Sequence, residues 1–353
     1  MYAKDDASRD RSYDGSDYGV GRKKEEELMD KIKFGILAAG NIANSMAKAV
    51  QDLEDIECCA VASRSIGKAK DFAGKWGFEK SYGSYEELVN DPEVELVYVA
   101  SPHSHHYAHA KLCMEHGKHV LLEKAFTVNM SQAEELIALS KDKGLLLAEA
   151  FWPRYMPTRK MLDDLIAQGT IGEVQAVMAD FGAPLSHVER MWNPELAGGA
   201  LLDLGVYPIN FALQIFKSQV KRIQSDAVMS SLGVDQMNGI TLTFEDNKIA
   251  VLHSNMLAYM GNRGVVYGDK GFIELYEINN PREIRVFNEN KELTATYPAP
   301  EQVNGYEYEI IACVRAIRDS QIECEEMPHS ETLRLMKILD TIREQWGFKL
   351  PCE

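Results

Sequence analysis

A short run of small residues could hold the phosphates of a bound ligand. Residues 38–43 read AAGNIA, the spacing of a G-x-G-x-x-G turn with Ala in place of the first and third Gly. Such a turn between a strand and a helix lets backbone N–H groups at the helix N-terminus approach a pyrophosphate. We assign dinucleotide contacts to Ala38, Gly40, Asn41 and Ile42. Mere packing of a βα turn is the alternative.

A basic, hydroxyl-bearing cluster follows where a dinucleotide ribose is usually bound. About 20 residues after the turn, a site that prefers NAD carries an Asp or Glu for the ribose 2′-hydroxyl. This chain instead has Ser63, Arg64 and Ser65, followed by Lys68. An Arg beside hydroxyl groups suits a 2′-phosphate, so we predict NADP in preference to NAD. Ser63, Arg64 and Lys68 are the expected contacts, and a solvated helix start is the alternative.

A histidine-rich segment allows two interpretations. Residues 101–109 read SPHSHHYAH, and His105 and His109 stand at i, i+4, which would put both on one helical face as metal ligands. No carboxylate or thiolate partner is evident, so we predict no metal site. A loop at the carboxyl end of a parallel strand more often lies against a cofactor. We therefore assign Ser101, His103 and His106 to cofactor binding.

Alternating strands and helices must position these residues. Continuous apolar runs of the kind found in parallel sheets covered on both faces alternate with helical segments. The expected strands lie within residues 31–37, 55–63, 94–101, 118–125 and 145–152, and Gly117 and Gly144 end two of the helices between them. The pattern predicts an α/β, doubly wound Rossmann domain over residues 31–152.

The second half has a different texture. Eight strand-like segments follow one another between residues 173 and 298. Hairpin signals at residues 245–247 and 268–271 join two pairs of them. A helix begins within GGALLDLGVYPINFALQIF, and a helical pair lies near residues 306–318 and 331–346. We predict an α+β domain over residues 153–353, with a large, mostly antiparallel open sheet.

Composition excludes several classes of protein. Of 353 residues, 38 are Lys or Arg and 54 are Asp or Glu, so the net charge of −16 disfavours nucleic acid and anionic membranes. The six cysteines lack the spacing of a zinc ribbon or a disulfide framework, and we find neither a membrane helix nor a signal peptide. We expect a cytoplasmic protein. Residues 1–30, polar and of mixed charge, are predicted to be a flexible extension.

Two motifs make the chain resemble the glucose-fructose oxidoreductase/inositol dehydrogenase (Gfo/Idh/MocA) family. They are Glu123-Lys124-Ala125 and GGALLDLGVYPI at residues 198–209. EAFWPRYMP, from residue 149, and the ending LDTIREQWGFKLPCE are similar to the branch of dihydrodiol and D-xylose dehydrogenases. The resemblance implies a site between the domains, with Glu123 and Lys124 near the cofactor, and a homodimer or dimer of dimers through the open sheet. Ala125 departs from the family's usual Pro.

The second motif supplies groups for proton transfer. A phenol with a pKa of about 10 is a poor base at neutral pH, but a nearby ammonium favours the phenolate. We assign Tyr207 as general acid/base and Lys124 as the group that lowers its pKa. Asp203 lies four residues before Tyr207, so on a helix it would project from the same face and could hold a substrate hydroxyl or orient the base. A Lys–Asp ion pair beside a buried Tyr is the structural alternative.

Residues between the motifs could form the wall of a substrate pocket. Trp152, Arg154 and Tyr155 follow the last predicted Rossmann strand, and an aromatic face suits the apolar side of a sugar or diol ring. Packing between the domains is the alternative. Asn193 is a further substrate candidate, within a predicted flap that also contains His187, Arg190 and Trp192.

Three functions remain open on this evidence. The first is an NADP-dependent dehydrogenase that acts on an aldose or a cyclic vicinal diol. The second is a reductase of a ketosugar or inosose that uses the same residues in reverse. The third is a non-catalytic NADP-binding regulator, because fold does not fix function.

Overall fold

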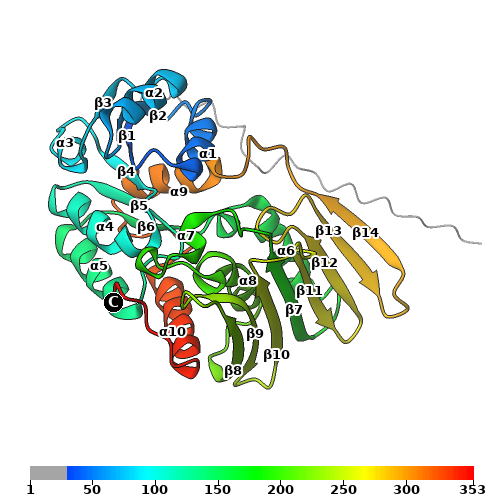
Figure 1. Ribbon diagram of the computed structural model, residues 1–353. Helices are drawn as coiled ribbons and strands as arrows, with labels where there is room; N and C mark the ends of the chain where they lie inside the picture. The colour runs from blue at the N-terminus through cyan, green and yellow to red at the C-terminus, as the bar shows by residue number, and fades with distance from the viewer. Residues whose placement is uncertain (1–29) are drawn as a thin grey trace, which may run out of the picture.

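The chain folds around two sheets, A and B, of unequal size (Figure 1). The computed structural model describes residues 30–353. The extension predicted for residues 1–30 lies outside the described residues, except for Asp30. Sheet A belongs to the first half of the described chain and sheet B to the second half, as the change of sequence pattern between the halves predicts.

Sheet A is parallel throughout, with strand order β3-β2-β1-β4-β5-β6. Its strands are β1 (Ile32–Leu37), β2 (Ile56–Ala62), β3 (Lys80–Tyr82), β4 (Leu96–Val99), β5 (His119–Glu123) and β6 (Leu147–Ala150). The order is that of a doubly wound Rossmann sheet, so the predicted fold class is confirmed. The sequence reading missed β3, because three partly exposed residues at a sheet edge carry no continuous apolar run.

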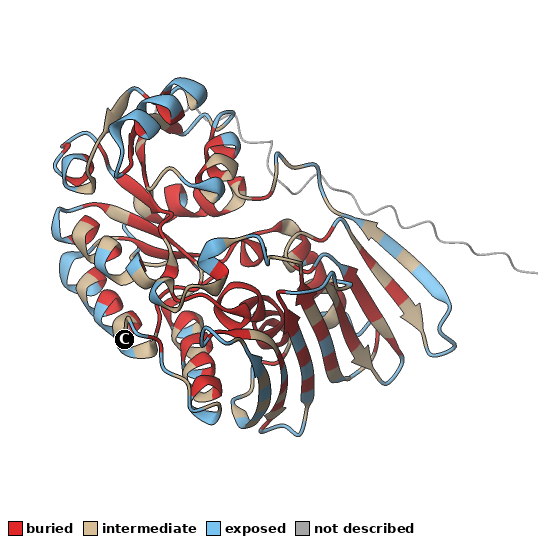
Figure 2. Ribbon diagram, viewed as in Figure 1, coloured by how far each residue is buried: buried red, intermediate tan, exposed pale blue. Residues whose placement is uncertain are grey.

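Helices cover both faces of sheet A and make its strands the most buried part of this half (Figure 2). They are α1 (Asn41–Val50), α2 (Ile66–Trp76), α3 (Tyr85–Val89), α4 (His106–Glu115) and α5 (Met130–Lys143). Capping residues mark both ends of α5. The side chain of Asn129 accepts the N–H of Gln132 at the start of α5, and Gly144, with φ of 63°, ends that helix as predicted.

Sheet B has the order β14-β13-β12-β11-β7-β10-β9-β8. Its strands are β7 (Val174–Gly182), β8 (Val220–Met229), β9 (Asp235–Phe244), β10 (Ile249–Asn255), β11 (Arg263–Gly268), β12 (Gly271–Tyr276), β13 (Glu283–Asn288) and β14 (Leu293–Pro298). Only the β7–β10 pair is parallel, so the prediction of a mostly antiparallel sheet is confirmed.

One apolar helical stretch fills the core between the sheets. It contains a π-helical turn (Leu201–Gly205) that continues into α8 (Val206–Ile215), which packs on β7 and β10. By length and composition, residues Pro194–Ile215 could cross a membrane, but 94% of the most apolar window is buried inside the protein. We therefore interpret it as a core helix. The short helix α7 (Glu189–Trp192) and helix α6 (Pro157–Ala167) precede it.

The end of the chain returns to the first half. Helix α9 (Glu307–Arg318) packs on α1, and α10 (His329–Gln345) packs on α5 (Figure 1). The amide of Asn304 donates to the carbonyl of Ser45 at 2.9 Å, and the Leu147 N–H donates to the carbonyl of Ile322 at 3.0 Å. These bonds attach the segments around the last two helices to the Rossmann half.

Candidate active site

The turn after β1 leaves open space where a pyrophosphate is expected. Gly40, with φ of −92°, is the N-cap of α1, and no side chain caps this helix. A Cβ placed on Gly40 would meet no heavy atom within 4 Å. Ala38 has φ of 79°, in the left-handed region that favours the Gly of the usual pattern. The helix N-terminus therefore has no side-chain cap and has open space at Gly40, which fits the approach of a dinucleotide phosphate.

The corner after β2 lies beside this turn, because Ala62 pairs with Leu37 at the carboxyl ends of two parallel strands. Arg64 and Lys68 are exposed here, whereas Ser63 is buried and donates its N–H to the carbonyl of Tyr82 at 3.2 Å. The corner thus offers two solvated cations close to the dinucleotide turn.

The histidine loop is fixed by carbonyl groups from both halves. His103 Nδ1 lies 3.1 Å from the carbonyl oxygen of Ala197, so this nitrogen carries the proton. The two ring nitrogens of His106 lie 2.8 Å from the carbonyls of Ala125 and Ser101. Burial lowers the pKa of His103 to about 3 and that of His106 to about 4. A neutral His106 ring has a single N–H, so it donates to only one of its two carbonyl neighbours. These side chains hold the loop in place.

His105 and His109 do lie together, with ring centres 5.5 Å apart, but the second neighbour of His109 is an aromatic ring. Tyr85 packs against His109 edge to face at 4.8 Å. Burial is the main cause that lowers the pKa of His109 to about 4. The His109 ring therefore packs between the rings of His105 and Tyr85.

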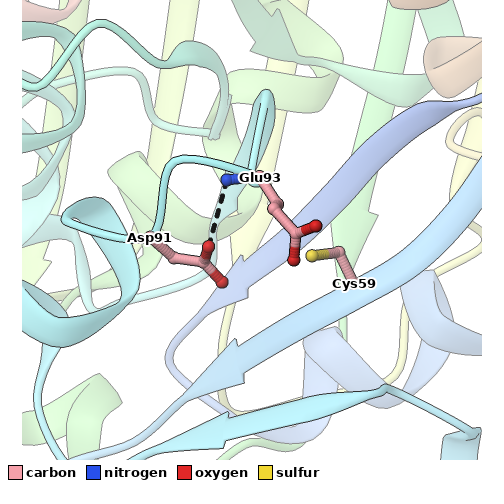
Figure 3. A group of neighbouring side chains, drawn as sticks. All are labelled: Cys59, Asp91 and Glu93. Carbon is pink, nitrogen blue, oxygen red and sulfur yellow. Dashed lines mark hydrogen bonds between the residues drawn. The ribbon is translucent and has the colours of Figure 1, made fainter.

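Cys59, Asp91 and Glu93 form a cluster that could resemble a metal site (Figure 3). Its carboxylates already have a cation, since the Lys80 ammonium pairs with Asp91 at 3.0 Å and also with Glu93. Burial raises the pKa of the Cys59 thiol to about 11, which disfavours the thiolate that a metal needs. The lysine supplies the positive charge, so we assign no metal to this cluster.

Lys124 reaches from the end of β5 into the second half. Its Nζ donates to the main-chain oxygen of Asp203 at 2.7 Å and to Oδ1 of the same residue at 3.2 Å. It also lies 5.0 Å from the ring centre of Tyr207. The peptide bond between Lys124 and Ala125 is cis. One buried ammonium thus contacts both residues of the second motif.

The helix that carries Asp203 and Tyr207 differs from the prediction. Asp203 lies in the π-helical turn and Tyr207 at the start of α8, so the two are not in a continuous α-helical i, i+4 register. The Leu201 N–H is accepted by a carboxylate oxygen of Asp235 on β9 at 2.9 Å, which fixes the start of the π turn from outside the helix. Asp203 and Tyr207 nevertheless face the same ammonium.

Asp203 is the electrostatic centre of the cluster. Besides Lys124, it accepts from Arg190 Nη1 at 3.1 Å and Nη2 at 3.3 Å, and His103 Nε2 lies 3.8 Å away. Burial raises the pKa of Asp203, but the two cations outweigh this effect and hold the pKa well below its usual range. Burial lowers the pKa of Lys124, and Asp203 leads the contributions that raise it overall. Carboxylate and ammonium are both charged.

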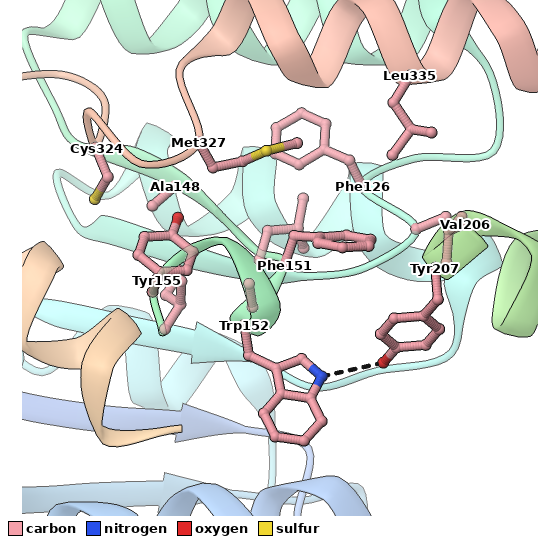
Figure 4. Close-up of a cluster of buried hydrophobic side chains, with 14 of the residues drawn as sticks. Phe126, Ala148, Phe151, Trp152, Tyr155, Val206, Tyr207, Cys324, Met327 and Leu335 are labelled. Carbon is pink, nitrogen blue, oxygen red and sulfur yellow. Dashed lines mark hydrogen bonds between the residues drawn. The ribbon is translucent and has the colours of Figure 1, made fainter. Parts of the chain in front are cut away.

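Three aromatic side chains contact Tyr207, and Figure 4 shows two of them, Phe151 and Trp152. The Tyr207 oxygen accepts the indole N–H of Trp152 at 3.2 Å, and its ring centre lies 5.4 Å from that of Phe151 and 4.6 Å from that of Phe181. Burial raises its pKa, whereas Lys124 and the Trp152 hydrogen bond lower it. The net direction is upward, because the loss of hydration outweighs the ammonium. Lys124 lowers the pKa of Tyr207, as predicted, but burial raises it by more.

Family models match both halves of the chain. One described as "Oxidoreductase family, NAD-binding Rossmann fold" matches residues 32–151, and one described as "GFO/IDH/MocA C-terminal domain" matches residues 160–274. The chain belongs to the GFO/IDH/MocA oxidoreductase family. The resemblance found in its motifs is therefore confirmed, and the protein is an oxidoreductase.

Individual members of this family agree with the assignment. Proteins named trans-1,2-dihydrobenzene-1,2-diol dehydrogenase from Mus musculus and Homo sapiens are each 33% identical, over 91% of this chain and 98% of the relative. KijD10, a 3-ketoreductase from Actinomadura kijaniata solved with NADP and TDP-benzene, has a TM-score of 0.82 at 25% identity. That comparison covers 89% of this chain and 98% of KijD10.

Several residues predicted from the sequence have side chains engaged elsewhere in this GFO/IDH/MocA fold. The guanidinium of Arg154 donates to Asn210 at 2.6 Å and to Glu331 at 3.0 Å. The Tyr155 hydroxyl donates to the carbonyl of Glu149 at 2.8 Å, and Figure 4 shows this ring beside Ala148, on the side away from Tyr207. Both side chains therefore join elements of the core.

Two further candidates also have partners within the protein. The side chain of Asn193 accepts the N–H of Glu195 at 3.0 Å and caps a short 3₁₀ helix (Pro194–Leu196). The buried carboxylate of Glu123 accepts the hydroxyl of Tyr98 and, at 3.1 Å, the N–H of Lys124. Glu123 thus lies behind the lysine and holds its backbone.

Sequence reasoning missed two members of the site. Arg190 was expected only in a flap, yet it binds the Asp203 carboxylate with two nitrogens. Tyr306 comes from the start of α9, about 150 residues after Trp152, and the two rings stack with centres 4.4 Å apart and an angle of 6°. Neither residue belongs to a motif, and only the return of α9 to the first half brings Tyr306 here.

Proposed function

We propose that this oxidoreductase moves a hydride between the nicotinamide of NADP and a hydroxyl-bearing carbon of a sugar or cyclic diol, with Tyr207 as general acid/base. The observation that carries the proposal is the buried Lys124 ammonium, which contacts Asp203 and lies 5.0 Å from the Tyr207 ring centre. Oxidation of an alcohol needs a base for the hydroxyl proton, and an ammonium stabilises a phenolate. The names of the relatives, a diol dehydrogenase and a ketoreductase, support this substrate class.

The cofactor would lie along the carboxyl edge of sheet A. The open turn at Gly40 suits the pyrophosphate, and the exposed Arg64 and Lys68 suit a 2′-phosphate. Ser101 and the loop held by His103 and His106 would border it at the next strand. When bound, the nicotinamide accepts or supplies the hydride.

The chain's own residues would handle the proton. In oxidation, the Tyr207 phenolate takes the proton of the substrate hydroxyl, and in reduction the phenol returns it. Lys124 stabilises the phenolate by its charge. Asp203 keeps Lys124 charged and fixed, because its carboxylate and main-chain oxygen both accept from the ammonium. Trp152 and Tyr306 provide an apolar wall for the carbon skeleton of the substrate.

The role of Tyr207 is tested by Tyr207→Phe. We expect kcat to fall by about 10² to 10⁴, the range for loss of a general acid/base, while the Kd for NADPH, measured by fluorescence, stays unchanged. Tyr259→Phe is a matched control, because Tyr259 is 85% exposed. Near-normal turnover of Tyr207→Phe would reject the proposed mechanism.

The preference for NADP is tested by Arg64→Ala. Loss of a charge-assisted contact to phosphate, about 1.5 to 3 kcal/mol, should raise the KM for NADP by roughly 10- to 100-fold and leave that for NAD nearly unchanged. Lys70→Ala, on the exposed side of α2, is the control. Equal effects on both cofactors would contradict a 2′-phosphate contact.

The direction of the reaction and the regulator alternative are tested by one substrate panel. NADPH absorbance is followed with aldoses, inositols and cyclic diols in the presence of NADP, and with ketosugars and inososes in the presence of NADPH. Turnover only in the second set favours the ketosugar or inosose reductase. Cofactor binding without turnover on any member favours the regulator.

We infer that two copies associate through the open face of sheet B, which the family resemblance also implies. Met178 on β7 and Ile249 and Val251 on β10 are 49%, 40% and 44% exposed, and the first and last are paired across the two strands. An exposed apolar patch on a sheet face suits a homodimer. Val251→Lys should shift the sedimentation coefficient to that of a monomer, whereas Ile311→Lys, on α9, should not. A tetramer would indicate a dimer of dimers.

A further inference from the structure

The indole N–H of Trp152 is directed at the oxygen that would act as the base. Its Nε1 donates to Tyr207 Oη at 3.2 Å (Figure 4). We propose that Trp152 is a positioning residue that orients the Tyr207 oxygen and stabilises its phenolate form, in addition to lining the substrate pocket. The inference rests on the function proposed above for Tyr207.

Packing fixes the direction of this N–H. Trp152 lies in a 3₁₀ turn (Trp152–Arg154) directly after β6, and only 7% of its surface is exposed. One face of the indole stacks on Tyr306 at 4.4 Å. Gly305, with φ of 100°, precedes that ring, and a Cβ added there would come within 3.1 Å of the indole. The indole therefore has little freedom to turn its N–H away from Tyr207.

The chemistry of the two groups makes the contact useful in both protonation states. An indole N–H can only donate, whereas a phenol oxygen accepts as a neutral group and accepts more strongly as an anion. The hydrogen bond is thus stronger to the phenolate, and it shifts the equilibrium towards the base. Lys124 cannot replace it, because the hydrogen bonds of its Nζ within the described chain go to Asp203.

The other ionisable groups around Tyr207 oppose one another. Burial raises the pKa of Tyr207, the ammonium of Lys124 lowers it, and Glu123 and Asp203 raise it. Tyr306 also faces the phenol, but its own pKa is raised by burial, so it is neutral at working pH. The Trp152 hydrogen bond acts in the same direction as Lys124, against the effect of burial.

The test is the pH profile of kcat/KM for alcohol oxidation in Trp152→Phe. The smaller aromatic ring can still stack on Tyr306 but has no donor. Because a hydrogen bond to an ion is about twice as strong as one to a neutral group, we expect the acidic limb to move up by about one pH unit. On that limb the rate should fall about tenfold, with recovery at high pH.

Two further variants make the result specific. Trp346→Phe is the matched control, because the buried indole Nε1 of Trp346 has no hydrogen-bond partner among the described residues, and its profile should match that of the wild type. Replacement of Trp152 by β-(3-benzothienyl)alanine keeps the ring shape and removes only the N–H. It should reproduce the shift even if Trp152→Phe disturbs the packing.

The outcomes separate this inference from the proposed function. If Tyr207→Phe is inactive and both Trp152 replacements leave the acidic limb in place, the role of Trp152 is refuted and that of Tyr207 stands. A uniform fall in kcat/KM without a shift also refutes it, because lost packing alone would produce that result. If Tyr207→Phe is fully active, the proposed function itself fails.

Discussion

Replacement of Asp203 by Asn tests the charge balance of the site. The Lys124 and Asp203 side chains are only 13% and 9% exposed, and Oδ1 lies 3.2 Å from Nζ. Removal of one partner from a buried ion pair costs about 3 to 5 kcal/mol, because the other charge stays buried without compensation. Arg190 is 42% exposed and can turn to water, and Lys124 can lose its proton. We therefore expect the lower end, about 3 kcal/mol.

The measurement is urea unfolding at pH 7, followed by tryptophan fluorescence. Asp164→Asn serves as the matched control, because it removes a carboxylate from an exposed pair in which Lys160 and Asp164 are 64% and 34% exposed. Exposed pairs of this i, i+4 kind are worth about 0.5 kcal/mol or less. Equal unfolding free energies for Asp203→Asn and the wild type would refute the assignment of Asp203 as the partner that keeps Lys124 charged.

The pH dependence gives a second readout. The folded-state pKa of Asp203 lies well below its value of about 3.9 in an unfolded chain, because Lys124 and Arg190 outweigh the effect of burial. The stability that this carboxylate contributes is therefore present above about pH 4 and is lost as the pH falls through the lowered pKa. The wild type should therefore remain more stable than Asp203→Asn throughout the range from about pH 5 to pH 8. A difference that already disappears in that range would contradict the argument.

Three further predictions follow from single sites. Gly40→Val should change the free energy of unfolding by no more than about 1 kcal/mol, because its Cβ enters open space. It should weaken NADPH binding measured by calorimetry. An unchanged affinity would exclude the turn as the pyrophosphate site. Burial raises the pKa of Glu149 to about 7, so the wild type loses stability on the order of 3 kcal/mol as the pH rises from about 4.5 through 7. Melting curves of Glu149→Gln should lack this loss. If the stability of the variant falls with pH as steeply as that of the wild type, Glu149 is not its source. Ser84→Ala removes the capping box with Glu87 and should cost about 1 kcal/mol in urea unfolding; no change would show that the cap is dispensable.

The fold was largely readable because its signals are local. Continuous apolar runs marked five of the six parallel strands, and alternation with turn signals marked all eight strands of sheet B. The strand that was missed, β3, has three residues at a sheet edge, and its pairing with β2 depends on position and not on composition. The π-helical turn at Asp203 could not be predicted from the local sequence either, because the carboxylate of Asp235 on β9 accepts the N–H of Leu201 at its start.

The sequence by itself determined which reactive groups the protein has. The turn at Gly40, the cations at Arg64 and Lys68, and the pair Lys124 and Tyr207 all lie in short motifs whose residue types state their chemistry. Such motifs are legible because strand, turn and helix N-terminus are set by neighbours in the chain.

Only the tertiary structure decided what surrounds those groups. In the folded protein, Arg190 binds Asp203, and Tyr306 stacks on Trp152. The indole N–H of Trp152 donates to the Tyr207 oxygen, and Arg154 binds Asn210 in the core. All of these contacts except that between Arg190 and Asp203 join residues far apart in the chain. They depend on how α8 packs on sheet B and how α9 packs on α1. The net effect of burial on each pKa depends on the same packing.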